Sequence, residues 1–170
     1  MRRALLILLA VGVLFAASWS KYSTVSADLA AQRDGIEAEW SLVDAALERR
    51  AELVAKLGPA ESRTGTEIAV WKELAGAAEA LAAATTPRAK IDANNRISAL
   101  LVQLPRLESG AALQRLSDAE NRIAVERRRY NEMLEHYNAQ IQRFPDNIVA
   151  SIAGFARDDA YLPTEAGAQH

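Results

Sequence analysis

An apolar seam in the last third of the chain constrains the fold more than any other feature. Its residues recur at alternating steps of three and four, and they are Leu113, Leu116, Ile123, Tyr130, Leu134, Tyr137, Ile141 and Phe144. This spacing places them on one face of a helix. Because a long amphipathic helix is not stable alone in water, the seam predicts partner helices. Two positions where an apolar residue is expected hold Glu120 and Arg127 instead.

The prolines indicate where the helices end. Proline interrupts a helix interior and is tolerated at helix starts and in loops. The five prolines are Pro59, Pro87, Pro105, Pro145 and Pro163. The intervals between them predict helices over residues 23–57, 61–84, 87–104 and 109–143, and a short helix after Pro145 that ends near Phe155. Thr86 followed by Pro87 matches the preferred N-cap and first helical position.

Short connections between consecutive helices favour antiparallel neighbours. The sequence therefore predicts an all-α fold, an antiparallel up-down-up-down four-helix bundle with long first and last helices, on an N-terminal membrane anchor. The expected division is an anchor over residues 1–22, the bundle over residues 23–144, and a short apolar helix with an irregular tail over residues 145–170.

The N-terminal segment has the composition of a membrane-targeting sequence. A positive start is followed by an uncharged run over residues 4–17, and the expected anchor residues are Arg2, Arg3, Leu5, Leu9, Leu14 and Trp19. Two interpretations remain open. The run is short for a spanning helix, and small residues near Ser18 suit cleavage by a signal peptidase. Against cleavage, Trp19 and Tyr22 stand where interfacial aromatic residues belong, which favours a single-pass anchor in the cytoplasmic membrane.

In both interpretations the arginines stay cytoplasmic and the remaining chain is exported to the extracytoplasmic, periplasmic side. The fourth helix of such a bundle returns toward the membrane. Its end and the short helix that follows would form a membrane-proximal apolar segment with Phe144, Ile148, Ile152 and Phe155. This segment is expected either to pack across the end of the bundle or to contact the outer leaflet or a neighbouring membrane protein.

Composition excludes several classes of function. A formal net charge of -2 gives no electrostatic support for binding nucleic acid. The chain has no cysteine, which excludes disulfides and thiolate metal sites. A di-iron site in a helical bundle needs paired Glu-x-x-His motifs, but the histidines are only His136 and His170. We expect no cofactor, no metal and no enzymatic activity.

Polar residues at or beside the apolar seams are the candidate site. Arg50 interrupts a seven-residue series on the first helix, as Glu120 and Arg127 interrupt the last. Asn121, Asn131 and Asn138 lie beside the seam. One interpretation is a buried polar layer that fixes helix register, with Glu120, Glu39 or Glu52 as partners of the arginines. The other is a binding site for an anionic ligand or a partner's carboxylate.

Two stretches carry a family resemblance. In the last third they are Glu120-Asn121-Arg122-Ile123-Ala124, Arg127-Arg128-Arg129-Tyr130-Asn131, Tyr137-Asn138, Arg143-Phe144-Pro145 and Gly154-Phe155. On the first helix they are Val25, Ala27, Trp40-Ser41 and Arg49-Arg50-Ala51-Glu52-Leu53-Val54. With the N-terminal apolar segment, the sequence resembles the LemA family over nearly the whole chain. The resemblance implies a bacterial, membrane-anchored helical bundle without established enzymatic activity, and membrane proteins as partners.

The expected function is therefore a non-enzymatic interaction or scaffold protein for membrane-protein partners. The alternative is an envelope sensor that binds a small ligand or lipid between helices. Self-association is compatible with the interrupted seams, because the same pattern serves an intramolecular bundle or an assembled coiled coil.

Overall fold

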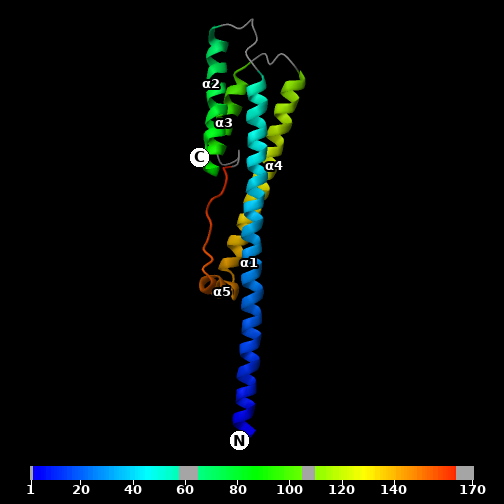
Figure 1. Ribbon diagram of the computed structural model, residues 1–170, viewed down its shortest axis with the longest axis vertical. Helices are drawn as coiled ribbons and strands as arrows, with labels where there is room; N and C mark the ends of the chain where they lie inside the picture. The colour runs from blue at the N-terminus through cyan, green and yellow to red at the C-terminus, as the bar shows by residue number, and fades with distance from the viewer. Residues whose placement is uncertain (1, 58–64, 105–109, 164–170) are drawn as a thin grey trace. The chain divides into compact units, whose positions relative to one another are not determined.

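The structure, a computed structural model, describes residues 2–57, 65–104 and 110–163. These ranges form five α-helices and contain no strand (Figure 1). The helices are α1 (Arg2–Lys56), α2 (Gly65–Ala83), α3 (Pro87–Val102), α4 (Gly110–Gln142) and α5 (Asp146–Ala153). The predicted all-α class is confirmed.

The helix bounds agree closely with the ends that the prolines and the Thr86 cap predicted. Thr86 adopts an extended backbone conformation, and its hydroxyl accepts a hydrogen bond from the Ala89 amide at 3.3 Å, so it caps α3. Pro87 is the first residue of that helix. The expected start of the second helix at residue 61 lies outside the described residues. The N-terminal apolar run and the predicted first helix form one unbroken helix, α1, because no proline falls between Arg2 and Lys56.

The chain divides into two compact units, and their bounds differ from the expected division. Unit 1 comprises residues 1–37 and 132–159, and unit 2 comprises residues 38–131 and 160–170. Each unit therefore includes part of α1 and part of α4. Unit 1 also contains α5, whereas α2 and α3 belong to unit 2.

Unit 2 has an aliphatic core with many alanines. Its helices α2 and α3 lie side by side (Figure 1). An exposed ion pair joins these two helices between Arg96 and Glu73 at 3.1 Å, and Lys90 on α3 forms an ion pair with Asp44 on α1. The most deeply buried apolar side chains of this unit are Val43, Leu47, Leu74, Leu81, Ile91, Ile97 and Ile123.

Unit 1 brings α1, α4 and α5 together. Its buried apolar residues are Val25, Leu29, Ile36, Leu134, Tyr137, Ile141, Val149 and Ala150. The two long helices approach closely at Gly35 on α1. A Cβ atom at that position would lie 2.9 Å from the Cε atom of Met133 on α4. Glycine thus allows the Met133 side chain to reach the backbone of α1.

The predicted seam of α4 is buried from Leu116 to Ile141, but the prediction that Phe144 is its last buried member is wrong. Phe144 is 75% exposed. The reason is that α4 ends at Gln142, so Phe144 no longer follows the helical repeat. The Leu113 side chain lies outside the described residues.

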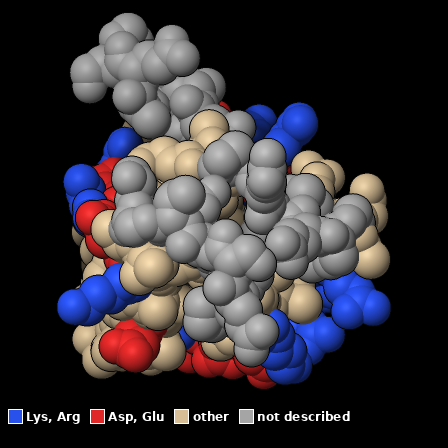
Figure 2. All heavy atoms as spheres, turned by 90° about the horizontal axis from the view of Figure 1, so that it is seen from above, with Lys and Arg blue, Asp and Glu red and all other residues tan. Residues whose placement is uncertain are grey.

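Charged side chains of both signs occur on the face in Figure 2, where Lys and Arg lie among Asp and Glu at its edge. This agrees with a formal net charge close to zero.

Candidate functional site

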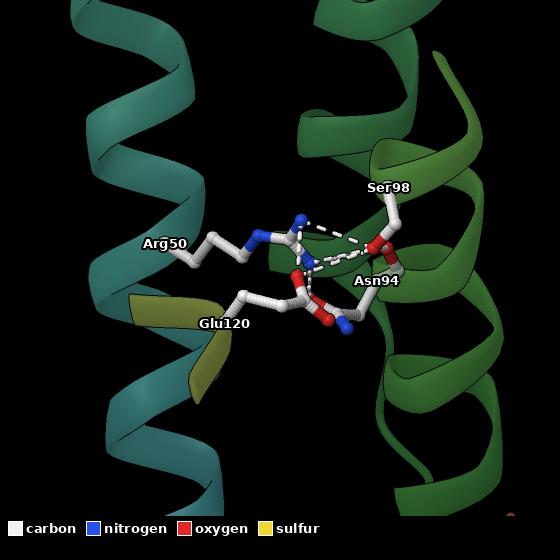
Figure 3. A network of polar contacts seen from close by, with 4 residues as sticks. All are labelled: Arg50, Asn94, Ser98 and Glu120. Carbon is white, nitrogen blue, oxygen red and sulfur yellow. Dashed lines mark hydrogen bonds and ion pairs between the residues drawn. The ribbon is translucent and has the colours of Figure 1, made fainter. Parts of the chain in front are cut away.

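Arg50 on α1 is a charged side chain buried in unit 2, with 2% of its surface exposed. Its guanidinium forms an ion pair with Glu120 on α4. It also donates hydrogen bonds to the side chains of Asn94 and Ser98 on α3, and both terminal nitrogens lie 3.0 Å from Ser98 Oγ. Figure 3 shows these four side chains pointing toward one another from three helices. We call this set the Arg50 network.

Helical spacing explains how these residues meet. Arg50 takes the position that an apolar residue holds seven residues earlier, at Val43. Asn94 lies three residues from both Ile91 and Ile97, and it is completely buried with them. Sequence reasoning missed Asn94 and Ser98, although the same three- and four-residue spacing places them on the apolar face of α3.

Burial is the largest influence on the pKa of the Arg50 guanidinium. It lowers the pKa of the Arg50 guanidinium, while the nearby Glu120 carboxylate acts in the opposite direction. The Arg50 side chain is 3% exposed and that of Glu120 27% exposed. The Ser98 hydroxyl lies 3.2 Å from Glu120 Oε2, to which it can donate. Protein groups thus occupy both terminal nitrogens of Arg50, which favours a role in helix register over capture of an anion.

A second polar cluster in unit 2 joins α1 and α4. Glu126 is 8% exposed and lies 3.8 Å from Arg122 and 3.4 Å from Arg129. Desolvation raises the pKa of Glu39, and the carboxyl group of Glu126 raises it further, whereas Arg129 lowers it. One carboxyl oxygen of Glu39, Oε1, is buried without a hydrogen-bond partner among the described residues. The carboxyl groups of Glu39 on α1 and Glu126 on α4 therefore interact across the two helices.

The remaining expected layer residues on α4 separate into buried and exposed positions. Arg127 is 4% exposed, on the buried side of the helix. Asn121 is exposed, so it does not lie in a buried layer, and its other expected role, in a partner site, stays a prediction. It lies one residue beyond Glu120, which turns it about 100° around the helix, away from the interior. Glu126, which the sequence analysis did not single out, takes an interior position.

Asn131 and Asn138 bind the backbone of the C-terminal segment, a role that the seam did not predict. In unit 2, Asn131 donates to the Leu162 carbonyl at 2.8 Å and accepts from the Leu162 amide at 2.9 Å. In unit 1, Asn138 does the same with Asp158, at 2.6 Å and 3.0 Å. The Tyr137 hydroxyl donates to the Ala156 carbonyl at 3.0 Å. These bonds satisfy backbone groups that belong to no helix or strand.

The expected anchor residues are exposed on α1. Leu9, Leu14 and Trp19 have 63%, 67% and 63% of their surfaces exposed, and Arg2 and Arg3 are exposed as well. The Leu5 side chain lies outside the description. In the described ranges, α1 is the one helix long and apolar enough to cross a membrane, judged by length and composition. None of its apolar window is buried against protein.

The short helix α5 has two different sides. Val149 and Ala150 are buried in unit 1, whereas Ile148 and Ile152 are 51% and 70% exposed. Phe155 is half-buried, after Gly154 ends α5 with a left-handed backbone conformation. Packing of α5 therefore uses Val149 and Ala150 and leaves apolar surface open.

Unit 2 contains a groove of about 580 Å³ among α1, α2 and α3 that sequence reasoning did not predict. Its apolar lining consists of five alanines and two leucines, namely Ala51, Ala55, Ala75, Ala78, Ala82, Leu47 and Leu81. Carboxylates of Asp44, Glu48, Glu52 and Glu79 also line it, with Lys90. We call this the alanine groove. Alanines at three- and four-residue steps on two helices are the signal that indicates it.

No group of three or more potential metal ligands comes together in the ranges that the structure describes. The polar clusters present are ion pairs and amide contacts between helices. In the described ranges these contacts hold helices and the C-terminal segment in place.

The described chain is thus an all-α protein with one candidate membrane span and polar networks between its helices. A family model for the LemA family matches residues 39–170. The match includes the Arg50 network, Asn131 and Asn138, and it begins within α1, beyond the uncharged run over residues 4–20. The chain belongs to the LemA family. No curated protein matches it.

Proposed function

We propose that this protein is a membrane-anchored, non-enzymatic interaction protein whose helical domain lies on the extracytoplasmic side of the cytoplasmic membrane. The carrying observation is the apolar window of α1, which is wholly exposed and continues without a break into the helical domain. Exposed apolar side chains on this scale need a nonpolar environment. Arg2 and Arg3 before this window favour a cytoplasmic N-terminus.

The proposed arrangement of unit 2 is an up-down-up-down four-helix bundle. Only three residues separate Ala83 at the end of α2 from Pro87 at the start of α3, and these helices are in contact. Short connections favour antiparallel neighbours. The ion pair of Arg50 with Glu120 adds a link between the first and fourth helices.

The partner site in this proposal is the alanine groove. Small side chains allow a helix of another protein to approach closely. Glu48 and Glu79 are exposed carboxylates that line the groove. Their charge favours a partner helix that carries lysine or arginine beside its apolar face. The occupant we propose is therefore a basic amphipathic helix of a membrane protein.

Site-specific photocrosslinking in native membranes tests this function. A photoreactive residue at Ala75 or Ala82, both in the groove, is expected to give a discrete protein adduct. The same residue at the exposed Ala80, which does not line the groove, is the matched control. The adduct should disappear when Glu48→Lys and Glu79→Lys reverse the charge. Equal crosslinking from Ala75 and Ala80, or an adduct that persists after charge reversal, contradicts the groove as the partner site.

The size of the same groove favours a second candidate function, an envelope sensor for a small ligand. About 580 Å³ lies within the range of small-molecule sites, roughly 300–1,000 Å³. A cationic apolar compound would match its alanines and carboxylates. Two results together support this candidate. Photocrosslinking gives no protein adduct, and the thiol of Ala75→Cys is protected from a thiol reagent only when a cell extract of small molecules is present.

A further inference from the structure

Apolar surface is concentrated at one part of unit 1. In the part of α1 that belongs to unit 1, the large exposed apolar residues end at Trp19. On and before α5 they are Phe144, Ile148 and Ile152. Members of both sets, among them Trp19, Ile148 and Ile152, line a shared cleft of about 630 Å³. Its residues are Phe15, Ser18, Trp19, Lys21 and Tyr22 from α1 and Pro145, Ile148, Val149 and Ile152 from the α5 region. We call this the α1–α5 cleft.

The cleft has an apolar body and a polar group at one end of its α1 wall. Phe15 is six residues before Lys21, which corresponds to about 9 Å along a helix. Among the described residues that line the cleft, Lys21 carries the one basic group. It lies 3.8 Å from Asp146, and its side chain is 58% exposed, so it can reach a further anion.

The position of Lys21 along α1 matches the edge of a bilayer. Residues 4–20 carry no charge, and at about 1.5 Å per residue they cover about 25 Å, slightly less than a hydrocarbon core of about 30 Å. Lys21 then falls at the level of the lipid headgroups, where a lysine extends its ammonium to the interface. Trp19 and Tyr22, whose ring centroids are 6.0 Å apart, fall at the same level.

We infer that the α1–α5 cleft binds one glycerophospholipid of the surrounding bilayer. The acyl chain lies against Phe15, Ile148 and Ile152, and the phosphate pairs with Lys21. The inference rests on the proposed membrane anchor. A lipid fits the cleft for two reasons. The cleft is continuous with the exposed apolar window of α1, and Lys21 lies at the level of the lipid phosphates.

The bound lipid accounts for the exposed apolar residues of α5. Val149 and Ala150 are buried and hold α5 to the protein, and the lipid covers Ile148 and Ile152. A phospholipid with one acyl chain in the cleft is held more weakly by apolar contact than one whose second chain also lies along α1.

Native mass spectrometry of the full-length chain in a mild detergent tests the inference, with phosphatidylglycerol added in known amounts. The wild-type protein is expected to retain one phospholipid per chain at a phosphatidylglycerol concentration too low for non-specific binding to the protein–detergent complex. Ser18→Trp fills the cleft and should weaken binding about tenfold or more. Ser20→Trp makes the same change on the opposite side of α1 and should leave binding unchanged.

A second variant keeps the test informative if Ser18→Trp perturbs folding. Lys21→Gln removes the charge and keeps a polar side chain that is one atom shorter, and we expect about fivefold weaker binding of phosphatidylglycerol. Binding of diacylglycerol, which has no phosphate, should be the same for Lys21→Gln and the wild type. A loss that is equal for both lipids contradicts the phosphate contact.

Three results overturn the lipid site. In the first, the wild-type chain retains no phospholipid. In the second, Ser18→Trp and Ser20→Trp bind phosphatidylglycerol with equal affinity. In the third, the species that Ser18→Trp abolishes contains a second protein chain instead of a lipid. Alkaline extraction of membranes separates these from failure of the anchor. If the anchor is wrong, the wild-type chain is released from the membrane. If only the lipid site is wrong, every variant stays in the membrane and binds no specific lipid.

Discussion

Arg50 on α1 and Glu120 on α4 form an ion pair inside unit 2, where the Arg50 side chain is 3% exposed. Removal of one partner leaves the other charge in a poorly solvated place, whereas replacement of both leaves none. We therefore expect Glu120→Ala to lower the free energy of unfolding by about 3 kcal/mol. The double change Arg50→Met with Glu120→Leu should fall within about 1 kcal/mol of the wild type. Thermal unfolding of the detergent-solubilised chain, followed by circular dichroism, measures both.

The Arg49–Glu52 pair is the matched control for this experiment. Its atoms are 2.9 Å apart, but its side chains are 61% and 57% exposed. Exposed pairs contribute little, so Arg49→Ala should change the free energy of unfolding by less than about 0.5 kcal/mol. Similar losses for Arg49→Ala and Glu120→Ala would show that burial does not determine the strength of the Arg50 network.

The Glu39–Glu126 pair predicts a dependence of stability on pH. The pKa of Glu39 is raised above its ordinary value of 4.5 by burial and by Glu126. At a pH between the ordinary and the folded pKa, Glu39 therefore binds a proton more tightly in the folded protein than in the unfolded chain. Its contribution to stability is present below this ordinary value and is lost as pH rises through the higher, folded value.

Glu39→Gln tests this relationship because an uncharged amide cannot repel Glu126. At neutral pH we expect the free energy of unfolding to rise by about 0.5 kcal/mol, the size of a like-charge repulsion between neighbouring helical residues. The variant should also lose the decline in stability just above pH 4.5. Glu48→Gln, an exposed carboxyl group on the same helix, should keep that decline. Melting temperatures measured across this pH range distinguish the two variants.

The sequence predicted the helices well because the residues that start and end a helix, such as N-caps and prolines, act locally. Thr86 and Pro87 begin α3 through a cap and a fixed backbone angle, and both effects act within one turn. The seam of α4 likewise depends only on the helical repeat. It failed at Phe144, because a repeat carries no information about the residue at which the helix stops.

The polar contacts were harder to predict because they depend on which helices meet. Arg50 and Glu120 are recognisable as interruptions of two apolar series, but their shared partners Asn94 and Ser98 come from a third helix. The bonds of Asn131 and Asn138 go to backbone groups of an irregular segment. Backbone groups carry no signature in the sequence, so residue types alone could not identify these partners.

Asn138 predicts how the C-terminal segment of unit 1 is held. Its side chain makes two hydrogen bonds to Asp158, and each such bond contributes about 1 kcal/mol net. Asn138→Ala should therefore raise hydrogen exchange at residues 156–159 by about tenfold or more. Asn121→Ala makes the same change at an exposed position of α4 and should leave exchange there unaltered. Unchanged exchange in Asn138→Ala would mean that other contacts hold this segment.

Two glycines within helices test the close approach of α1 and α4 in unit 1. A Cβ atom at Gly76 on α2 would meet nothing within 4 Å, whereas one at Gly35 on α1 would lie 2.9 Å from Met133 Cε. Alanine is favoured over glycine in a helix interior by about 1 kcal/mol. Gly76→Ala should therefore raise the free energy of unfolding by about that amount. Gly35→Ala should give less than half of it, since the end of the Met133 side chain must move.

A larger side chain at the same position separates propensity from contact. Gly35→Val places branched carbons where Met133 lies, and we expect it to lower the free energy of unfolding by about 1–3 kcal/mol, as overpacking does. Because the clash is with the Met133 side chain, adding Met133→Ala should restore most of that loss. Gly76→Val, without a neighbour to displace, should change stability by less than about 1 kcal/mol. A loss in Gly35→Val that Met133→Ala does not relieve would place the obstruction in the backbone of α4, and the two helices would then be in direct backbone contact at Gly35.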